Sequence, residues 1–422
     1  MNRSSPAHIA QDLVSNSSGT GDRERKRIAY VASESLAKIS SLLPSNRGRS
    51  LLVHSLVTSL GLHQSNASSA NHNSINILRP PLATAKDVLA YYDRDYVDYV
   101  LGKDIGHDEE RAAEFGLEDD CPPFAGIAQY VQGIAGATLA ATRALAEDLC
   151  DISICWDGGR HHAHKERASG FCYVNDCVLA LLALKRAPHR PRVLYLDLDL
   201  HFSDGVSSAF HSPSRTLPSQ LLTLSIHHAA PGFFPAGQLA QLPKVSEHAE
   251  EEANFDPFTL SVPLNGGGSN ATFAAIWPAI ERVKDAFGPD VVVVQCGVDG
   301  LAGDPCAIWN WGLGGEGGLG WCIDRIVHRW GAKVLLLGGG GYSSPNAARA
   351  WAYLTSITRG DTLSLDTPIP DHKAFPLYAP SFTLDVPAGN ARDHNTPQDI
   401  ADIERALRRA ADMIRDRLPH GA

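Results

Sequence analysis

Short apolar runs recur along this chain, and each is followed within a few residues by glycine, aspartate, histidine or tyrosine residues. The runs occupy residues 152–156, 193–200, 221–226, 291–295 and 334–337. Segments with a helical pattern precede most of them, at residues 133–149, 175–185, 274–287 and 323–330. Helices that alternate with Val- and Leu-rich strands predict an α/β fold with a parallel sheet covered on both faces. Because ligands bind at the carboxyl ends of such strands, the residues after the runs are candidates for one site.

The composition describes one domain preceded by a polar segment. Of the 422 residues, 44% are hydrophobic and 20% are charged, as in ordinary soluble globular proteins. Residues 1–26 are polar and are predicted to be disordered. Residues 27–422 contain no evident linker and are predicted to form a single domain.

The net charge, the cysteines and the length of the apolar runs restrict the partners and the compartment that we expect. A formal net charge of −10 argues against direct nucleic-acid binding. No apolar run is long enough to span a bilayer, and the first residues lack a secretory signal. The eight cysteines are scattered, which predicts free thiols in a reducing, intracellular compartment.

Three polar side chains share one face of the strand predicted to run from Val193 to His201. Side chains alternate along a strand, so Asp197, Asp199 and His201 point away from the leucines at 196, 198 and 200. Burying these groups is costly unless a cation compensates them, and Asp and His are typical zinc ligands. The alternative is a strand end exposed to water, where the three groups need no partner.

Asp299 follows the run at residues 291–295 in the same way. Beside Asp199 and His201 it would supply a third ligand, which leaves a coordination position open for water, as catalytic zinc requires. By itself, a strand-end aspartate is as often a helix cap or a turn residue.

Two further segments carry groups suited to acid–base chemistry. His161 and His162 follow a Gly-Gly turn, and Asp197 and Asp204 are available to orient and tune their imidazoles. Paired histidines also occur by chance or on surfaces. Tyr342 follows four glycines and could donate a hydrogen bond to a developing oxyanion, although an ordinary loop tyrosine is the alternative.

Five segments together resemble the class I zinc-dependent histone deacetylases, and the absence of a long tail resembles the short-tailed members. The segments are 158–176 (GGRHHAHKERASGFCYVND), 197–201 (DLDLH), 231–235 (PGFFP), 303–305 (GDP) and 338–342 (GGGGY). The resemblance extends from about residue 28 to residue 403 in the family's order. It implies the arginase/deacetylase fold, a single α/β domain built around a parallel eight-stranded sheet.

The resemblance also implies roles for individual residues. Zn²⁺, or Fe²⁺ in its place, would be bound by Asp199, His201 and Asp299. His161 and His162 would be the acid–base pair, held by Asp197 and Asp204, respectively, with His162 nearest the attacking water. Tyr342 would polarise the acetyl carbonyl. A structural K⁺ or Na⁺ would be bound by Asp197, Asp199, His201, Ser225 and Ile226.

Substrate contacts are implied in the same way. Gly170, Phe171 and Phe234 would line a narrow tunnel, Cys306 would stand at the pocket wall, Asp120 would hold substrate backbone amides at the rim, and Arg49 would lie near an acetate-release pocket. The chain departs from the family at Phe202-Ser203, Arg160 and Cys306. The first departure should change packing, and the other two could alter acyl-chain or sequence preference.

The implied activity is hydrolysis of N6-acetyl-lysine to lysine and acetate. Substrates would be histone tails or non-histone chromatin proteins, a cohesin subunit among them. The protein would repress transcription in the nucleus and could also occur in the cytoplasm. Whether it belongs to a large corepressor complex stays open. The alternatives are an acetylpolyamine or small-amide deacetylase of the same superfamily and an inactive corepressor scaffold. The run ASGFCYVND at 168–176 disfavours the first, and the filled catalytic positions disfavour the second.

Cys121 and Cys172 could form a regulatory disulfide, although free thiols are the expected state.

Overall fold

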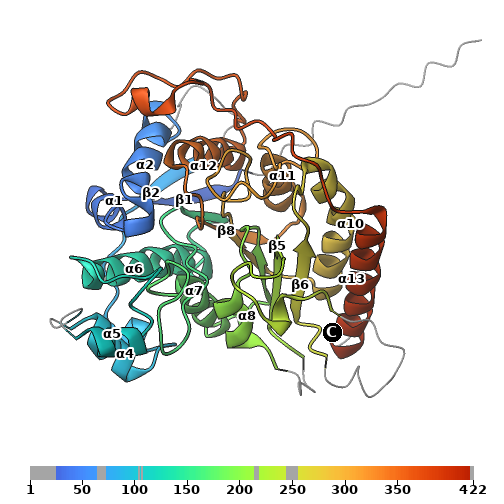
Figure 1. Ribbon diagram of the computed structural model, residues 1–422, viewed down its shortest axis with the longest axis horizontal. Coiled ribbons are helices and arrows are strands. Elements are labelled where there is room, and N and C mark those ends of the chain that lie inside the picture. The colour runs from blue at the N-terminus through green and yellow to red at the C-terminus, as the bar shows by residue number, and fades with distance from the viewer. Residues whose placement is uncertain are drawn as a thin grey trace, which may run out of the picture.

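One parallel sheet organises the protein (Figure 1). The structure is a computed structural model that describes residues 25–63, 73–102, 105, 108–212, 218–243 and 255–418. Within these residues, eight strands pair in the order β2-β1-β3-β8-β7-β4-β5-β6, and every pair is parallel. The strands are β1 (Arg27–Val31), β2 (Ser74–Leu78), β3 (Ile152–Cys155), β4 (Val193–Asp197), β5 (Leu221–His228), β6 (Thr259–Leu264), β7 (Val291–Gln295) and β8 (Lys333–Leu337). The predicted α/β architecture is therefore confirmed.

Helices cover both faces of the sheet. They are α1 (Glu34–Ser40), α2 (Arg49–Ser59), α3 (Ala85–Val88), α4 (Arg94–Val100), α5 (Glu109–Glu114), α6 (Ile127–Ala146), α7 (Asp176–Lys185), α8 (Asp204–Phe210), α10 (Asn270–Phe287), α11 (Leu319–Arg329), α12 (Ser344–Arg359) and α13 (Pro397–Arg417), with short 3-10 helices η1 (Pro44–Asn46), η2 (Gln238–Ala240) and η3 (Phe375–Tyr378). Leu194 and Leu196 share a core with residues of α2, α10, α11, α12 and α13, whereas Val193 and Tyr195 share another with α6 and α7. Alternate side chains of β4 therefore pack into two separate hydrophobic cores, one on each face of the sheet.

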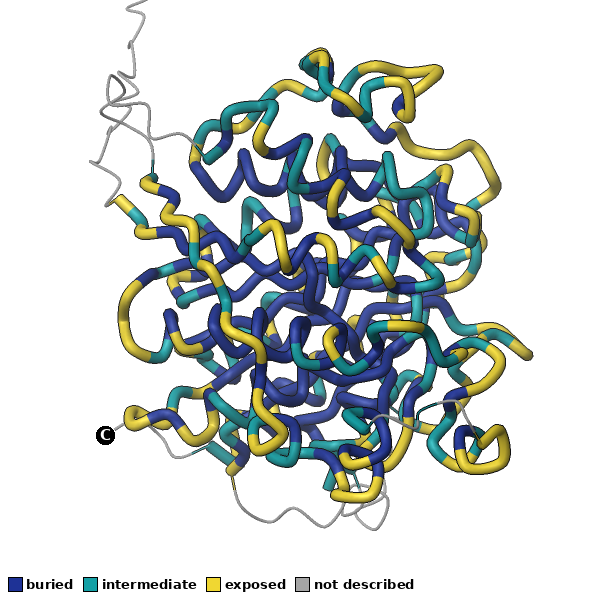
Figure 2. Tube along the Cα trace, turned by 90° about the vertical axis from the view of Figure 1, so that its left-hand side faces the viewer, coloured by how far each residue is buried: buried dark blue, intermediate teal, exposed yellow. Residues whose placement is uncertain are grey.

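The central strands are buried from end to end. Every residue of β3, β4, β5 and β7 is buried, which explains why these segments read as continuous apolar runs. Figure 2 shows the buried part of the trace in the interior and the exposed part on the outer turns. No helix among the described residues is both long and apolar enough to cross a membrane.

The strand predicted for residues 193–201 is shorter in the structure, because it ends at Asp197. The Leu198 N–H still donates to Gln295 O of β7 at 3.0 Å, but the next three backbone N–H groups donate to carboxylates instead of a neighbouring strand. The N–H groups of Asp199, Leu200 and His201 donate to Asp197, Asp299 and Asp199, respectively. The leucines at 198 and 200 nevertheless stay in the same core as those at 194 and 196, so the predicted alternation of faces holds.

Other expectations about secondary structure were incomplete. Residues 85–101, predicted as one helix, form α3 and α4, because extended Asp93 (ψ 146) caps α4 and its N–H donates to Lys165 O at 3.0 Å. Strands β2 and β6 and helix α12 were not predicted from the sequence. The predicted disordered segment, residues 1–26, lies outside the described residues except for its last two positions.

Candidate active site

The polar residues that follow four adjacent strands meet at one edge of the sheet. Strands β3, β8, β7 and β4 are neighbours in this order, and all of them are parallel. Their carboxyl ends therefore bring together segments 156–162, 338–342, 296–299 and 198–204, which lie far apart in the sequence.

Asp199, His201 and Asp299 form a compact cluster, which we call the acidic centre. His201 Nδ1 lies 2.9 Å from Asp299 Oδ2 and 3.3 Å from Asp199 Oδ1. Both carboxylates are buried, each with 1% of its surface exposed, and the imidazole is partly buried. The structure thus brings together the three residues that the sequence suggested as metal ligands.

Neighbouring amides fix the carboxylates of the acidic centre. Asp199 Oδ2 accepts hydrogen bonds from Gln295 Nε2 at 2.7 Å and from the Gly340 N–H at 2.8 Å. Gln295 also donates to Gly159 O at 3.1 Å, so it links three strand ends. The sequence analysis did not identify Gln295, although a polar residue that ends an all-valine strand was a visible signal.

The acidic centre has the composition and charge that a divalent cation requires. Burial, and then the charge of Asp199, raise the pKa of Asp299 to about 7, because two buried carboxylates repel each other. A bound cation would remove that penalty. Cys306 adds a fourth possible donor, since one ligand atom each of His201, Asp299 and Cys306 lie within 4.8 Å of one another. Two carboxylates and an imidazole suit first-row divalent metals.

Two histidine–aspartate pairs lie beside the acidic centre. His161 Nδ1 lies 2.8 Å from Asp197 Oδ2, and His162 Nδ1 lies 2.8 Å from Asp204 Oδ1. The imidazole rings of the two histidines are 4.0 Å apart, centroid to centroid. Asp204 also lies 3.1 Å from His164 Nε2, a contact that the sequence analysis did not foresee.

The two imidazoles have opposite protonation preferences. Burial opposes charge on His161, but Asp197 and Asp199 outweigh it and raise the pKa of His161 to about 9. Burial and the neighbouring charge of His161 lower the pKa of His162 to about 4, in spite of Asp204. At neutral pH the site therefore contains one protonated and one neutral imidazole, a combination suited to acid–base chemistry.

Tyr342 is held at the site by its own backbone. Its N–H donates to Asp304 Oδ2 at 2.7 Å, and the other oxygen of Asp304 accepts the Cys306 N–H at 3.1 Å. Burial, and then the charges of Asp299 and Asp199, keep the pKa of the Tyr342 phenol well above its usual value. The phenol therefore stays protonated and able to donate a hydrogen bond. Asp304 belongs to the GDP segment, but its role in positioning Tyr342 was not foreseen.

Aromatic rings surround the approach to the histidines. Phe234 is 42% exposed, and its ring centroid lies 5.0 Å from that of His162. Phe171 lies 5.6 Å from Tyr342 in an edge-to-face arrangement. Phe233, which the sequence analysis did not single out, stacks on His201 at 5.1 Å with an interplanar angle of 12°. These rings form an apolar wall around polar groups.

Gly170 joins the rim to the histidine pair. Its φ is +54°, and a Cβ atom there would lie 2.4 Å from His162 Cδ2, so only glycine fits. Its N–H donates to Asp120 Oδ2 at 2.9 Å, which ties the predicted rim aspartate to the turn.

The remaining expectations concern residues around the site. Arg49 is buried and donates to Gly341 O and Gly339 O at 2.8 and 2.9 Å. Ser225 pairs in register with Asp197, which places β5 beside the proposed monovalent cation residues. All eight cysteines are free, so Cys121 and Cys172 are not joined, and burial raises the pKa of both thiols.

Comparison with known proteins agrees with this geometry. The family profile described as "Histone deacetylase domain" matches residues 43–358. "Histone deacetylase 8" of Danio rerio is 34% identical over 392 residues, which cover 92% of this chain and 96% of that protein. "Histone deacetylase 8" of Xenopus tropicalis is 35% identical over 85% of this chain and 90% of that protein, and "Histone deacetylase 9" of Arabidopsis thaliana is 34% identical over 86% and 79%.

This chain belongs to the histone deacetylase family.

The resemblance to class I histone deacetylases is thereby confirmed, together with the arginase/deacetylase fold. The protein is a hydrolase with lysine deacetylase activity, and the comparisons do not favour a polyamine deacetylase or a scaffold. Its family implies a divalent metal, and the acidic centre fits one.

Proposed function

We propose that this histone deacetylase is a zinc enzyme that deacetylates lysine side chains of proteins, with Zn²⁺ held by Asp199, His201 and Asp299. The observation that carries this proposal is that His201 Nδ1 lies within 3.3 Å of a carboxylate oxygen of both Asp199 and Asp299, beside two histidine–aspartate pairs. Zinc suits mixed oxygen and nitrogen ligands, and Fe²⁺ would accept the same set.

The chain's own residues would divide the chemistry between them. His162 is neutral at physiological pH and would take a proton from the attacking water, with Asp204 orienting its ring. His161 is protonated and paired with Asp197, so it would stabilise negative charge that develops on the substrate. Tyr342 would donate a hydrogen bond to the acyl oxygen. The metal, when bound, supplies Lewis-acid activation of the water and the acyl carbonyl.

The walls of the site suit a neutral acyl-lysine side chain. Phe171 and Phe234 would flank its aliphatic stem, with Gly170 and Cys306 completing the wall, and Asp120 would bind backbone amides of the substrate. The products are acetate and a charged lysine, which the aromatic wall would not retain.

Histone tails are the substrates that the charge of this chain favours. Its net charge of −10 suits a basic protein segment better than DNA. Non-histone chromatin proteins, a cohesin subunit among them, would be further substrates, and deacetylation in the nucleus would repress transcription.

A structural K⁺ or Na⁺ is a separate part of the proposal. It would lie between β4 and β5 and use Asp197, Asp199, His201, Ser225 and Ile226. Asp197 and Ser225 are paired in register, and both are buried, so a monovalent cation there would offset the charge of Asp197.

An assay with matched substrates tests the proposed function. The purified full-length chain, stripped with a chelator and reloaded with zinc or Fe²⁺, would be given acetylated histone-tail peptides, acetylated cohesin peptides and acetylspermidine. We expect zinc-dependent hydrolysis of the peptides, with kcat/KM at least about tenfold above that for acetylspermidine. Preference for the polyamine, or activity that survives without metal, would contradict the proposal.

A further inference from the structure

The thiol of Cys306 belongs to the same cluster of donor atoms as the acidic centre. One ligand atom each of His201, Asp299 and Cys306 lie within 4.8 Å of one another. Asp199 completes the group, because its Oδ1 lies 3.3 Å from His201 Nδ1. Two carboxylates, an imidazole and a thiol are the number and the kinds of donor that close a four-coordinate zinc site. The acidic centre without the thiol would leave one position open.

A tight turn fixes Cys306 beside the acidic centre. The Cys306 N–H donates to Asp304 Oδ1 at 3.1 Å, and the Ala307 N–H donates to Asp304 O at 2.9 Å. The other carboxylate oxygen of Asp304 accepts the N–H groups of Tyr342 and Ser343 at 2.7 and 3.1 Å. Ala307 has a φ of +50°, which a residue with a side chain adopts only where its surroundings impose it. The position of Cys306 is therefore built into the segment that also holds Tyr342.

Cys306 is also the most accessible of the cysteines. All eight cysteines lie in the described part of the chain and are free; seven of them are buried, and Cys306 is partly exposed. The thiol beside the proposed metal ligands is therefore the one that a reagent in the pocket can reach. Cys306 is one of the positions at which the chain departs from its family, so this fourth donor is a feature of the chain itself.

The cluster needs only a small contraction to bind one ion. Donor atoms around a tetrahedral zinc lie roughly 3 to 4 Å apart, so the donors of Cys306, His201 and Asp299 have to approach one another by about 1 Å. Thiolate, and not thiol, binds metals, so zinc binding would release the Cys306 Sγ proton to water. A thiolate also makes the site softer, which favours zinc over Fe²⁺.

We propose that Cys306 is a fourth protein ligand of the metal in the substrate-free enzyme, and that acyl-lysine displaces it. The inference rests on the proposed function, since it assumes a metal at Asp199, His201 and Asp299. A catalytic zinc site keeps one position open, whereas a site with four protein ligands is closed. The substrate-free enzyme would thus rest in a closed form, which an acyl-lysine that enters the pocket would open.

Cobalt absorption tests the fourth ligand directly. The full-length chain would be stripped with a chelator and loaded with Co²⁺, which accepts the same ligands as zinc and absorbs light. A thiolate ligand adds an intense charge-transfer band in the near ultraviolet, which oxygen and nitrogen ligands do not give. We expect the band in the wild type and its loss in Cys306→Ser and Cys306→Leu, with folding checked by circular dichroism. Cys150→Ala, which removes a buried free thiol at the amino end of β3, is the matched control and should keep the band.

Protection of the thiol gives a second measurement. Iodoacetamide would be added to the metal-free and the zinc-loaded chain, and mass spectrometry would identify the labelled cysteine. We expect zinc to slow the alkylation of Cys306 about tenfold or more in the wild type, because a thiolate bound to metal is a weaker nucleophile than a free one. In Asp299→Asn, which should not hold the metal, zinc should have no such effect.

Displacement is tested with a bound substrate. Cobalt-loaded His162→Ala, which should turn over slowly, would be titrated with an acetyl-lysine peptide and with the same peptide carrying unmodified lysine. The charge-transfer band should weaken as the acetyl peptide saturates the site, and it should persist with the lysine peptide. A band that the acetyl peptide leaves unchanged would overturn the displacement.

The outcomes distinguish this inference from the proposed function. A wild type that binds cobalt and hydrolyses acetyl peptides with zinc, but shows neither the band nor the protection, would overturn the role of Cys306 and leave the proposed function intact. A wild type that shows the band but hydrolyses no acetyl peptide with zinc would refute the proposed function instead, because absorption is measured without turnover.

Discussion

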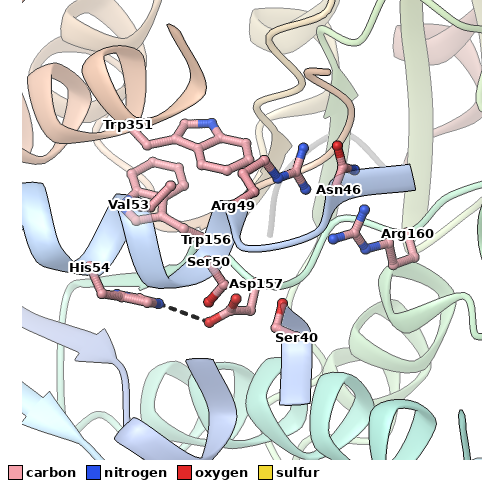
Figure 3. Close-up of a pocket in the computed structure, with 10 residues that line it drawn as sticks. All are labelled: Ser40, Asn46, Arg49, Ser50, Val53, His54, Trp156, Asp157, Arg160 and Trp351. Carbon is pink, nitrogen blue, oxygen red and sulfur yellow. Dashed lines mark hydrogen bonds and ion pairs between the residues drawn. The ribbon is translucent and has the colours of Figure 1, made fainter. Parts of the chain in front are cut away.

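The acidic centre lies beside a second buried region of opposite charge (Figure 3), a small cavity lined by Arg49 and Arg160 among others, which we call the basic cavity. In the first, two buried carboxylates crowd an imidazole, and the pKa of Asp299 rises. In the second, the guanidinium groups of Arg49 and Arg160 are both buried, and burial and the charge of Arg160 lower the pKa of Arg49. The carboxylate of Asp157 in the same lining is paired with His54. In each region, burial and a neighbouring like charge make one ionised group less stable: Asp299 beside Asp199, and Arg49 beside Arg160.

One glycine segment, residues 338–341, separates the two regions. Its N–H at Gly340 faces the Asp199 carboxylate, and its carbonyls at Gly339 and Gly341 face the Arg49 guanidinium. A Cβ atom on Gly340 would lie 2.3 Å from Asp299 Oδ2, and one on Gly339 would lie 2.2 Å from Gln295 Nε2. The comparison shows that glycine backbone, with an N–H donor toward the carboxylate and carbonyl acceptors toward the guanidinium, separates two buried groups of opposite charge.

The largest effect should come from the histidine that serves the acidic centre. We expect His162→Ala to lower kcat by about 10²- to 10⁴-fold, because the neutral base is lost, with no comparable loss of folding. Steady-state kinetics and circular dichroism would measure both. His164→Ala is the matched control, because His164 also contacts Asp204 but is not proposed to act on water, and it should lower kcat much less.

Tyr342→Phe should have the next largest effect, about 10²- to 10³-fold in kcat, since it removes only the hydrogen-bond donor proposed for the acyl oxygen. The ring remains, so KM should change little. Tyr353→Phe, a partly buried tyrosine on α12, serves as the control. Near-normal turnover by Tyr342→Phe would exclude the phenol from catalysis.

Gly340→Ala should disturb the acidic centre from the glycine segment. The added methyl group would displace the carboxylate of Asp299, so we expect zinc affinity and kcat/KM to fall about 10- to 100-fold. Gly266→Ala is the control, because nothing lies within 4 Å of a Cβ atom there. Zinc titration against a competing chelator would measure the change. Unaltered zinc affinity would mean that the close packing of Gly340 against Asp299 does not matter for metal binding.

The smallest effect should be a shift in pH dependence. Activity requires neutral His162, which forms above a pKa of about 4, and protonated His161, which is lost above about 9. Because the charge of Asp197 raises the pKa of His161, Asp197→Asn should move the alkaline limb of the kcat/KM profile to lower pH. The acid limb should move less, since His162 pairs with Asp204. An alkaline limb that stays in place would assign it to another group.

The strongest periodic patterns predicted the fold well. The runs that became β3, β4, β5, β7 and β8 are buried on both faces, so their sequences are apolar throughout. Strand β2 was missed because it is an edge strand with only one buried residue, Ile75. The end of β4 was misplaced because carboxylates, which a pattern of apolar residues does not reveal, accept the N–H groups of residues 199–201.

The same distinction applies to the site. Residues at strand ends, such as Asp199 and Asp299, follow from alternation and topology, and family resemblance supplied roles for them. Gln295 and Phe233 were missed because their contacts depend on which strand and loop lie alongside. The clustering of Arg160 with Arg49 depends on the helix that packs over the sheet, and short-range sequence patterns carry no record of that packing.

The amount of zinc bound by each chain tests the central claim most directly. After reconstitution and removal of free metal, elemental analysis should find one zinc ion per wild-type chain, and one in Arg160→Met, which alters only the basic cavity. Asp299→Asn and Asp199→Asn should retain far less than one while remaining folded. If both aspartate variants kept a full equivalent of zinc, the metal would lie elsewhere and the assignment of the acidic centre would be contradicted.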